Sequence, residues 1–170
     1  DGVYANPIKT AAGAWQIPAE VTLANAGIKE ENAKVEIQLL DEHNKVIGSA
    51  ASAIKVPVLG ERTAKVVRDV NSPTLWSIEN PYLYKVVTSV KLDGQAVDQL
   101  ATKCGFRTIR FSADSGFFLN DKWVKIKGTC NHLDHAGVGV AVPDALWAFR
   151  IGKLKEMGSN AYRCSHNPPP

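Results

Sequence analysis

Residues 84–94, Tyr-Lys-Val-Val-Thr-Ser-Val-Lys-Leu-Asp-Gly, decide the fold class of the first part of the chain. Apolar and polar side chains take opposite parities here, with Tyr84, Val86, Val90 and Leu92 on one and Lys85, Ser89 and Lys91 on the other. A period of two places one set on the buried face of a β-strand and the other in water. Asp93-Gly94 accepts positive φ at both turn positions, which predicts a tight hairpin into residues 96–103.

The same alternation recurs upstream. Val35, Ile37 and Leu39 alternate with polar residues, residues 64–70 continue the pattern, and Val21 with Leu23 indicates an earlier strand. Residues 45–56 are a weaker candidate. Roughly six or seven short strands separated by turns in about 110 residues are typical of an immunoglobulin-like sandwich. We therefore predict such a β-sandwich domain over residues 1–111, with His43 in a solvated bend. Along the whole chain, core positions rather than ligand platforms are expected for Trp76, Tyr82, Tyr84, Trp123 and Trp147.

Residues 112–170 have a different pattern. Phe117-Phe118-Leu119 and a strand at 123–127 flank a turn, and a polar, glycine-rich loop follows at 129–142. A helix is predicted from Pro143-Asp144, with Asp144 available for capping, to Gly158, whose backbone suits a left-handed end. One apolar stripe consists of Trp147, Ile151, Leu154 and Met157. A strand at 160–164 completes the opening of an α/β unit.

We therefore expect a mainly β chain whose sandwich is followed by a truncated α/β, TIM-barrel-like N-terminal segment, because a closed barrel needs roughly 200 residues or more. Residues 143–170 are expected to pack against the sandwich or a second copy of the chain, since an amphipathic helix without neighbours is sticky.

Composition excludes several classes of protein. Hydrophobic residues make up 45% and charged residues 22%, which is ordinary for a globular domain. The formal charge of +3 gives no support for a nucleic-acid partner, and no run of about 18 apolar residues predicts a membrane span. Cys104, Cys130 and Cys164 form neither a disulfide framework nor a CxxC zinc motif. We expect no metal and no cofactor.

Two polar clusters could carry chemistry, Cys130–His135 and Arg163–Asn167. Three interpretations compete: a metal site using ligand-type side chains, a nucleophile at Ser165 beside a histidine, and a polar substrate pocket. We favour the pocket, because loops after neighbouring parallel strands meet at one rim, where His132 and His166 can bind sugar hydroxyls and Arg163 can hold a carboxylate. The alternative is that His132 and His135 are merely solvated.

The chain also resembles glycoside hydrolase family 2, and most of all its bacterial β-galactosidases. The resemblance covers most of the chain and rests on the order and spacing of five segments: residues 75–84 (LWSIENPYLY), 105–107 (GFR), 116–122 (GFFLNDK), 127–132 (KGTCNH) and 154–166 (LKEMGSNAYRCSH). It implies an immunoglobulin-like domain over 1–111 and, over 112–170, the first hairpin, strand, helix and second strand of a catalytic barrel.

The resemblance also implies roles for single residues. His132 and His166 match positions that contact galactose hydroxyls, and Arg163 matches a position near the catalytic nucleophile. Asn131, where relatives often carry Arg, and Asp134, in a variable stretch, are weaker substrate-binding candidates. Family members hydrolyse with retention, using two carboxylates about 5–5.5 Å apart. The acid/base of the family follows an Asn, and no Asn-Glu pair occurs in this chain. No catalytic residue is therefore expected within it.

We expect an inactive piece of a β-galactosidase, with a β-galactoside as partner of the longer enzyme. A non-catalytic carbohydrate-binding or structural sandwich module is the alternative. A homo-oligomer is left open, and a periplasmic or extracytoplasmic compartment is favoured over the cytoplasm.

Overall fold

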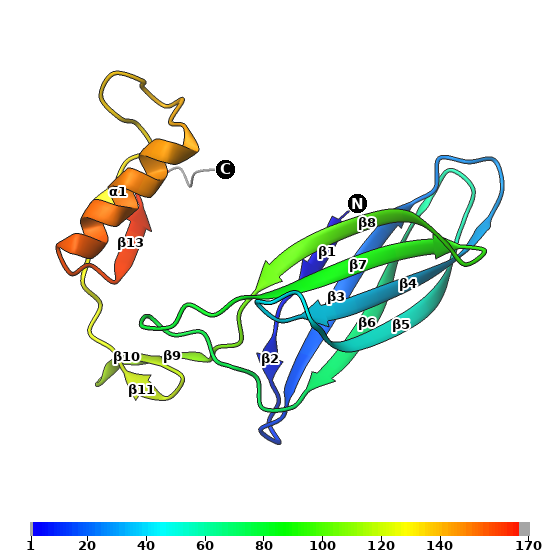
Figure 1. The fold of residues 1–170 in the computed structure, drawn as a ribbon, viewed down its shortest axis with the longest axis horizontal. Helices are drawn as coiled ribbons and strands as arrows, with labels where there is room; N and C mark the ends of the chain where they lie inside the picture. Colours follow the sequence, from blue (N-terminus) through cyan, green and yellow to red (C-terminus); the bar gives the residue numbers. More distant parts are fainter. Residues whose placement is uncertain (1, 167–170) are drawn as a thin grey trace. The chain divides into compact units, whose positions relative to one another are not determined.

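A computed structural model of the protein describes residues 2–166 and divides into two units, Asp1–Ile109 and Arg110–Pro170. Figure 1 shows strands in the first unit and a mixture of short strands and one helix in the second. No helix within the described residues is long and apolar enough to cross a membrane. The domain boundary predicted between residues 111 and 112 stays a prediction.

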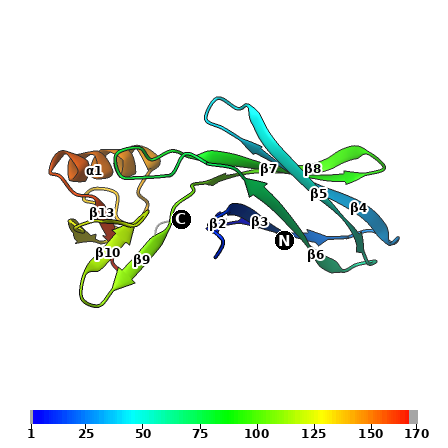
Figure 2. The same cartoon turned by 90° about the horizontal axis from the view of Figure 1, so that it is seen from below.

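The first unit is built of two antiparallel sheets. Within the described residues its strands are β1 (Gly2–Ala5), β2 (Ile8–Lys9), β3 (Trp15–Ala24), β4 (Glu31–Leu40), β5 (Val46–Val56), β6 (Glu61–Val70), β7 (Tyr84–Leu92) and β8 (Gln95–Cys104). In one sheet β6 pairs with one side of β3, and β1 and β2 pair with the other side. The second sheet has the order β5-β4-β7-β8 (Figures 1 and 2). This confirms the predicted sandwich, and the strand order is consistent with an immunoglobulin-like arrangement.

The register of the sandwich follows the alternation in the sequence. Val35, Ile37 and Leu39 of β4 are almost fully buried, so the parity predicted for this strand is confirmed. The β7–β8 hairpin turns at Asp93-Gly94, where φ is 48° and 82°, as the turn residues predicted. The weak candidate at 45–56 is a strand, β5, whose backbone pairs with β4 along its length.

An aromatic cluster fixes one end of the core. Phe106 is fully buried and meets the rings of Trp15 and Tyr84 edge-on, at centroid distances of 5.5 and 5.0 Å. The Tyr84 hydroxyl accepts a hydrogen bond from the Thr74 N–H at 2.8 Å. This contact anchors the long connection between β6 and β7, much as a tyrosine corner does in immunoglobulin-like domains.

The predicted aromatic core is correct only in part. Tyr84 is buried, Tyr82 packs against the core, and Trp76 and Trp147 are partly buried. Trp123 is 60% exposed, so its assignment to the core was wrong. Trp123 lies in a short hairpin. Its indole N–H donates to the Ser115 carbonyl at 2.8 Å, and its ring remains in solvent.

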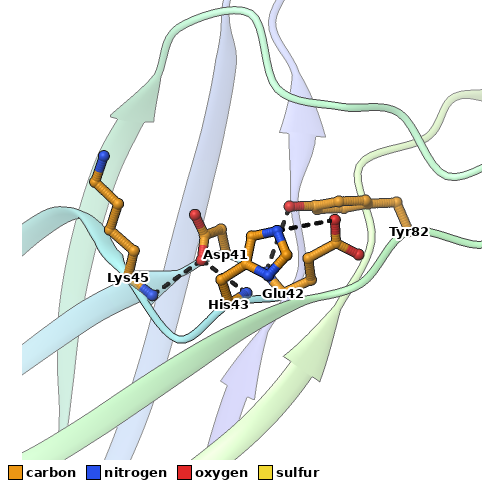
Figure 3. Close-up of polar contacts among 5 residues, drawn as sticks. All are labelled: Asp41, Glu42, His43, Lys45 and Tyr82. Carbon is orange, nitrogen blue, oxygen red and sulfur yellow. Dashed lines mark hydrogen bonds and ion pairs between the residues drawn. The ribbon is translucent and has the colours of Figure 1, made fainter.

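His43 lies in the predicted solvated bend between β4 and β5. Figure 3 shows the Asp41 carboxylate accepting hydrogen bonds from the N–H groups of His43 and Lys45, both at 2.9 Å. The His43 ring is exposed and approaches the Glu42 carboxylate at 3.7 Å. The Tyr82 hydroxyl accepts from the Glu42 N–H at 3.4 Å. These contacts shape a turn and build no enclosed site.

The second unit begins with a three-stranded sheet. Its strands β9 (Ile109–Ser112), β10 (Gly116–Leu119) and β11 (Lys122–Trp123) lie in the order β11-β10-β9. The predicted hairpin after Leu119 is present, with positive φ at Asn120 and Asp121. The predicted strand at 123–127 is wrong beyond Trp123. The Asn160 side chain accepts from the Lys127 N–H and donates to the Lys125 carbonyl, so these backbone groups bond a side chain instead of a neighbouring strand.

A strand–helix–strand unit follows. β12 (Gly128–Asn131) and β13 (Ala161–Cys164) pair in parallel, and the helix α1 (Asp144–Glu156) connects them (Figure 1). The loop predicted at 129–142 therefore begins only after Asn131. The parallel pair with its helical crossover confirms the predicted α/β opening, whereas its place in a barrel stays a prediction.

The ends of α1 are close to those predicted, but two details differ. Pro143 is the N-cap residue and no side chain caps the helix, so the predicted capping by Asp144 was wrong. Gly158 has φ 86°, and the N–H groups of Gly158 and Ser159 donate to the Lys155 and Leu154 carbonyls, which is a Schellman ending.

The apolar stripe of α1 is not buried. No residue of the helix is buried, and Ile151 and Met157 are 44% and 66% exposed. The predicted packing of residues 143–170 against the sandwich or a second copy stays a prediction, and its last four residues, 167–170, lie outside the described part.

Candidate functional site

The candidate site lies at the carboxyl ends of β12 and β13. Because the two strands are parallel, these ends meet at the same edge, where the Ser165 N–H donates to the Asn131 carbonyl at 2.9 Å. This bond brings the next residue of each segment, His132 and His166, side by side. Their imidazole rings lie 5.6 Å apart between centroids, at an interplanar angle of 63°. The pairing predicted from topology is present, although the strand before His132 is 128–131 rather than 123–127.

His166 adopts an uncommon backbone conformation. Its φ is 66°, in the left-handed region that few residues other than glycine occupy. The chain thus turns sharply after Ser165, which is 4% exposed. Both histidine side chains have polar ring atoms that can donate or accept hydrogen bonds, depending on tautomer.

Arg163 lies on β13 opposite Cys130 of β12. Its Nη1 donates to the Cys130 Sγ at 3.6 Å and to the Ser165 Oγ at 3.3 Å. Within residues 2–166 no carboxylate forms an ion pair with this guanidinium. Its other N–H groups can therefore bind an acceptor on a ligand.

Asn131 is on the other face of the two-stranded sheet. It alternates with Cys130 along β12, so it shares a face with Thr129 rather than with Arg163. Its Nδ2 donates to the Thr129 carbonyl and to the Thr129 Oγ1, both at 2.9 Å. The structure therefore separates Asn131 from Arg163, because the amide is held along its own strand.

The loop after His132 is held by a residue that sequence reasoning missed. Arg150 of α1 donates from Nη2 to the His132 carbonyl at 2.9 Å and from Nη1 to the Asp134 carbonyl at 3.2 Å. Asp134 is thus engaged through its backbone. His135 forms the start of a tight turn, exchanging backbone hydrogen bonds with Gly139 at 2.9 Å. The available signal for Arg150 was its spacing of i+3 from Trp147 on the helix.

The competing interpretations of the two clusters gain no support. Among the described residues no group of three or more His, Cys, Asp and Glu side chains could hold a metal ion. Ser165 Oγ accepts from Arg163 and has no hydrogen bond to a histidine, so nothing in the described part activates it as a nucleophile. Asn167, at the end of the second cluster, lies outside the described residues.

The sandwich offers a different hollow, of about 460 Å³, lined by residues that include Trp76, Lys103 and Arg107. A flat aromatic face there would suit a carbohydrate-binding module. However, the Arg107 guanidinium lies 4.8 Å above the centre of the Trp76 ring, so that face is covered. That face of the Trp76 ring therefore provides no open stacking platform.

Comparison with known proteins shows the family of the chain. The family model "Glycosyl hydrolases family 2" matches residues 1–107. Beta-galactosidase BoGH2A of Bacteroides ovatus is 36% identical over 148 residues, which are 87% of this chain and 17% of that protein. A beta-glucuronidase of Bacteroides fragilis is 30% identical over 155 residues, 90% of this chain and 22% of that protein.

A solved structure from the same family is also similar to this chain. The structure of a glycosyl hydrolase family 2 member from Bacteroides cellulosilyticus superposes with a TM-score of 0.87 and 33% identity, covering 99% of this chain and 22% of that one. The chain thus spans less than a quarter of the length of each of these three relatives. Because the family model matches more than half of the residues of this chain, the chain belongs to glycosyl hydrolase family 2.

Proposed function

We propose that residues 1–111 are the immunoglobulin-like domain, and residues 112–170 the first part of the catalytic TIM barrel, of a retaining β-galactosidase that hydrolyses terminal β-D-galactosides. The observation that carries this proposal is the approach of His132 and His166 to 5.6 Å at the carboxyl ends of two parallel strands. In α/β barrels that edge is where ligands bind. Family membership of the chain and the β-galactosidase among its relatives support the choice of a glycoside.

The proposed role of this chain is binding and orientation. Two adjacent imidazoles can donate to and accept from neighbouring sugar hydroxyls, which fixes the ring of a bound galactose. Arg163 adds a positive charge on the same edge, and charged donors form the stronger hydrogen bonds. Asn131 and Asp134 are weaker candidates, since the Asn131 amide bonds Thr129 and Asp134 is held through its carbonyl.

Bond cleavage would come from residues that this chain does not contain. Retaining hydrolysis needs an acid/base and a nucleophile about 5–5.5 Å apart. The sequence contains no Asn-Glu pair of the kind that carries the acid/base in the family. We therefore propose that the 170-residue chain turns over no β-galactoside by itself.

A β-glucuronide is the second candidate substrate. Several relatives carry the name beta-glucuronidase, among them the protein of Bacteroides fragilis. The Arg163 guanidinium has no carboxylate partner in the described residues and could pair with the carboxylate of a glucuronide. The galactoside is preferred because the two histidines together suit a neutral, hydroxyl-rich sugar.

The two sugars can be compared directly by NMR titration of the ¹⁵N-labelled chain. D-Galactose should shift the resonances of His132, Arg163 and His166, with millimolar affinity because three side chains make few contacts with the sugar. Stronger shifts with D-glucuronate at the same residues would favour the second candidate. Shifts confined to residues 1–111 would instead support a carbohydrate-binding module and contradict the proposal.

Enzymatic assays complete the test. Neither nitrophenyl β-D-galactoside nor nitrophenyl β-D-glucuronide should be hydrolysed by the 170-residue chain. A longer polypeptide that includes a complete barrel should hydrolyse the galactoside faster. Saturable hydrolysis by the 170-residue chain that disappears in His166→Ala would contradict the assignment of the chemistry to other residues.

A further inference from the structure

We propose that Arg150 is a positioning residue for the His132–His166 pair, holding the loop after β12 from the side of helix α1. Arg150 has no role in the sequence-based interpretation. Its two terminal nitrogens each donate to a different backbone carbonyl, those of His132 at 2.9 Å and Asp134 at 3.2 Å. A planar guanidinium can span two acceptors in this way, whereas a lysine ammonium acts as a single point of charge.

Among the described residues, the other backbone hydrogen bonds of the loop that Arg150 holds lie within the turn from His135 to Gly139. Gly137 and Gly139 both have positive φ, and no atom lies within 4 Å of the position of a Cβ on either. The tight turn between His135 and Gly139 closes the loop upon itself, but does not tie it to the helix or the sheet. Glycine-rich segments lose much backbone entropy when they are ordered, so a link to a regular element matters here.

His132 is fixed from both sides by this arrangement. On one side the Asn131 carbonyl accepts from the Ser165 N–H at 2.9 Å, which ties β12 to the segment that carries His166. On the other side the His132 carbonyl accepts from Arg150. With its backbone held before and after the side chain, the His132 ring keeps its place against His166.

Arg150 is itself held in position. Its guanidinium carbon lies 4.9 Å from the centre of the Trp147 ring, one helical turn earlier on α1. Stacking on an aromatic face restricts the rotamers of the arginine, so less entropy is lost when it binds the two carbonyls. Helix α1 thereby sets the geometry of the proposed sugar site without touching the sugar.

The test uses the 170-residue chain and a matched pair of variants. Arg150→Met keeps a long apolar side chain against Trp147 and removes all donors, and Arg150→Lys keeps the charge with a single ammonium. Lys153→Met is the control, because Lys153 is another cation of the same helix whose ammonium contacts residues of that helix, the Glu156 carboxylate at 2.7 Å and the Phe149 ring at 5.9 Å from its centre. Far-UV circular dichroism checks that each variant is folded.

The first readouts do not involve a sugar. In the unaltered chain, NMR should detect a nuclear Overhauser effect between the rings of His132 and His166. Arg150→Met should abolish it and speed hydrogen exchange of the amides at 133–139 by roughly five- to ten-fold, as expected when charge-assisted bonds at a partly exposed site are lost. Arg150→Lys should fall between, and Lys153→Met should match the unaltered chain.

The outcomes separate this inference from the proposed function on which it rests. Unchanged ring contact and exchange in Arg150→Met would overturn the positioning role, as would equal effects of Lys153→Met. Loss of the ring contact together with a weaker galactose response in Arg150→Met would support both proposals. Loss of the ring contact in a chain that shows no response to either sugar would uphold the positioning role and refute the sugar site.

Discussion

Gly128 of β12 faces Ala161 of β13 at a distance that only a glycine permits. A Cβ at residue 128 would lie 2.5 Å from the Ala161 carbonyl oxygen and 2.9 Å from its carbonyl carbon. Both atoms belong to the backbone of the paired strand, so neither can move without disturbing the register. The pairing of β12 with β13, the two strands that precede His132 and His166, therefore requires glycine at residue 128.

Gly128→Ala should destabilise the second unit by about 1–3 kcal/mol, the usual range for an overpacked site. Gly152→Ala is the matched control, since nothing lies within 4 Å of its Cβ position and alanine favours a helix by about 1 kcal/mol. Hydrogen exchange of the amides at 128–131 and 161–164 measures the difference. Equal protection of these amides in the two variants would contradict the claim that a side chain at residue 128 collides with the Ala161 backbone.

The Tyr84 hydroxyl gives a second comparison, this time in the sandwich. Tyr84→Phe leaves the Thr74 N–H without its acceptor at 2.8 Å and should lower the free energy of unfolding by about 1–2 kcal/mol. Tyr82→Phe should cost less than about 0.5 kcal/mol, because the Tyr82 hydroxyl is at 3.4 Å from an exposed N–H. Urea denaturation compares them, and a larger loss in Tyr82→Phe would contradict the tyrosine-corner role.

The three cysteines should differ in reactivity. Burial raises the pKa of the Cys104 thiol to about 11, whereas Cys130 and Cys164 are exposed. Because the thiolate is the nucleophile, Cys104 should stay unmodified by a disulfide reagent near neutral pH until the sandwich unfolds. Mass spectrometry of the native chain should therefore find labels at Cys130 and Cys164 only. Early labelling of Cys104 would mean that the core opens readily.

The pair formed by Glu36 and Lys91 predicts a pH dependence of stability. A hydrogen bond from Lys91, at 2.7 Å, is the main cause that lowers the pKa of the Glu36 carboxyl, against the opposing effect of burial. A depressed pKa in the folded state adds stability above the unfolded pKa of Glu, about 4.3, and this stability is lost as the pH falls through the folded value.

Glu36→Gln should therefore lower the urea midpoint near neutral pH, and the deficit should shrink in acid. Glu30→Gln serves as the control, because the Glu30–Lys55 pair is exposed and contributes little. A deficit of Glu36→Gln that is the same at all pH values would show that the carboxylate is not the source of the stability.

The sandwich was predictable because local signals agree with the packing. Alternation in β4 and β7 and the Asp93-Gly94 turn fix strands, faces and one hairpin before any contact is known. The prediction of a strand at 123–127 was wrong because it relied on the local pattern alone. The segment alternates like a strand, but its Lys127 N–H and Lys125 carbonyl bond the Asn160 side chain, and no local pattern records a partner so distant in sequence.

The site was predictable through topology and not through its details. Parallel strands bring the residues after them to one edge, which is why His132 and His166 could be paired from the sequence. Asn131 was predicted to lie in a loop, so the face of β12 that its side chain occupies was not predicted. Arg150 binds backbone carbonyls, and because every residue has a carbonyl, the sequence gives no sign of which ones an arginine will reach.

The most direct test of the account is a galactose titration of the ¹⁵N-labelled chain and of His132→Ala and His166→Ala, followed by NMR. The unaltered chain should show saturable shifts that cluster at residues 130–134 and 163–166, and either substitution should weaken the affinity by about ten-fold or more, since each removes direct hydrogen bonds to the sugar. Shifts that lie only within the sandwich, or that survive both substitutions unchanged, would contradict the claim that these two loops form part of a sugar site.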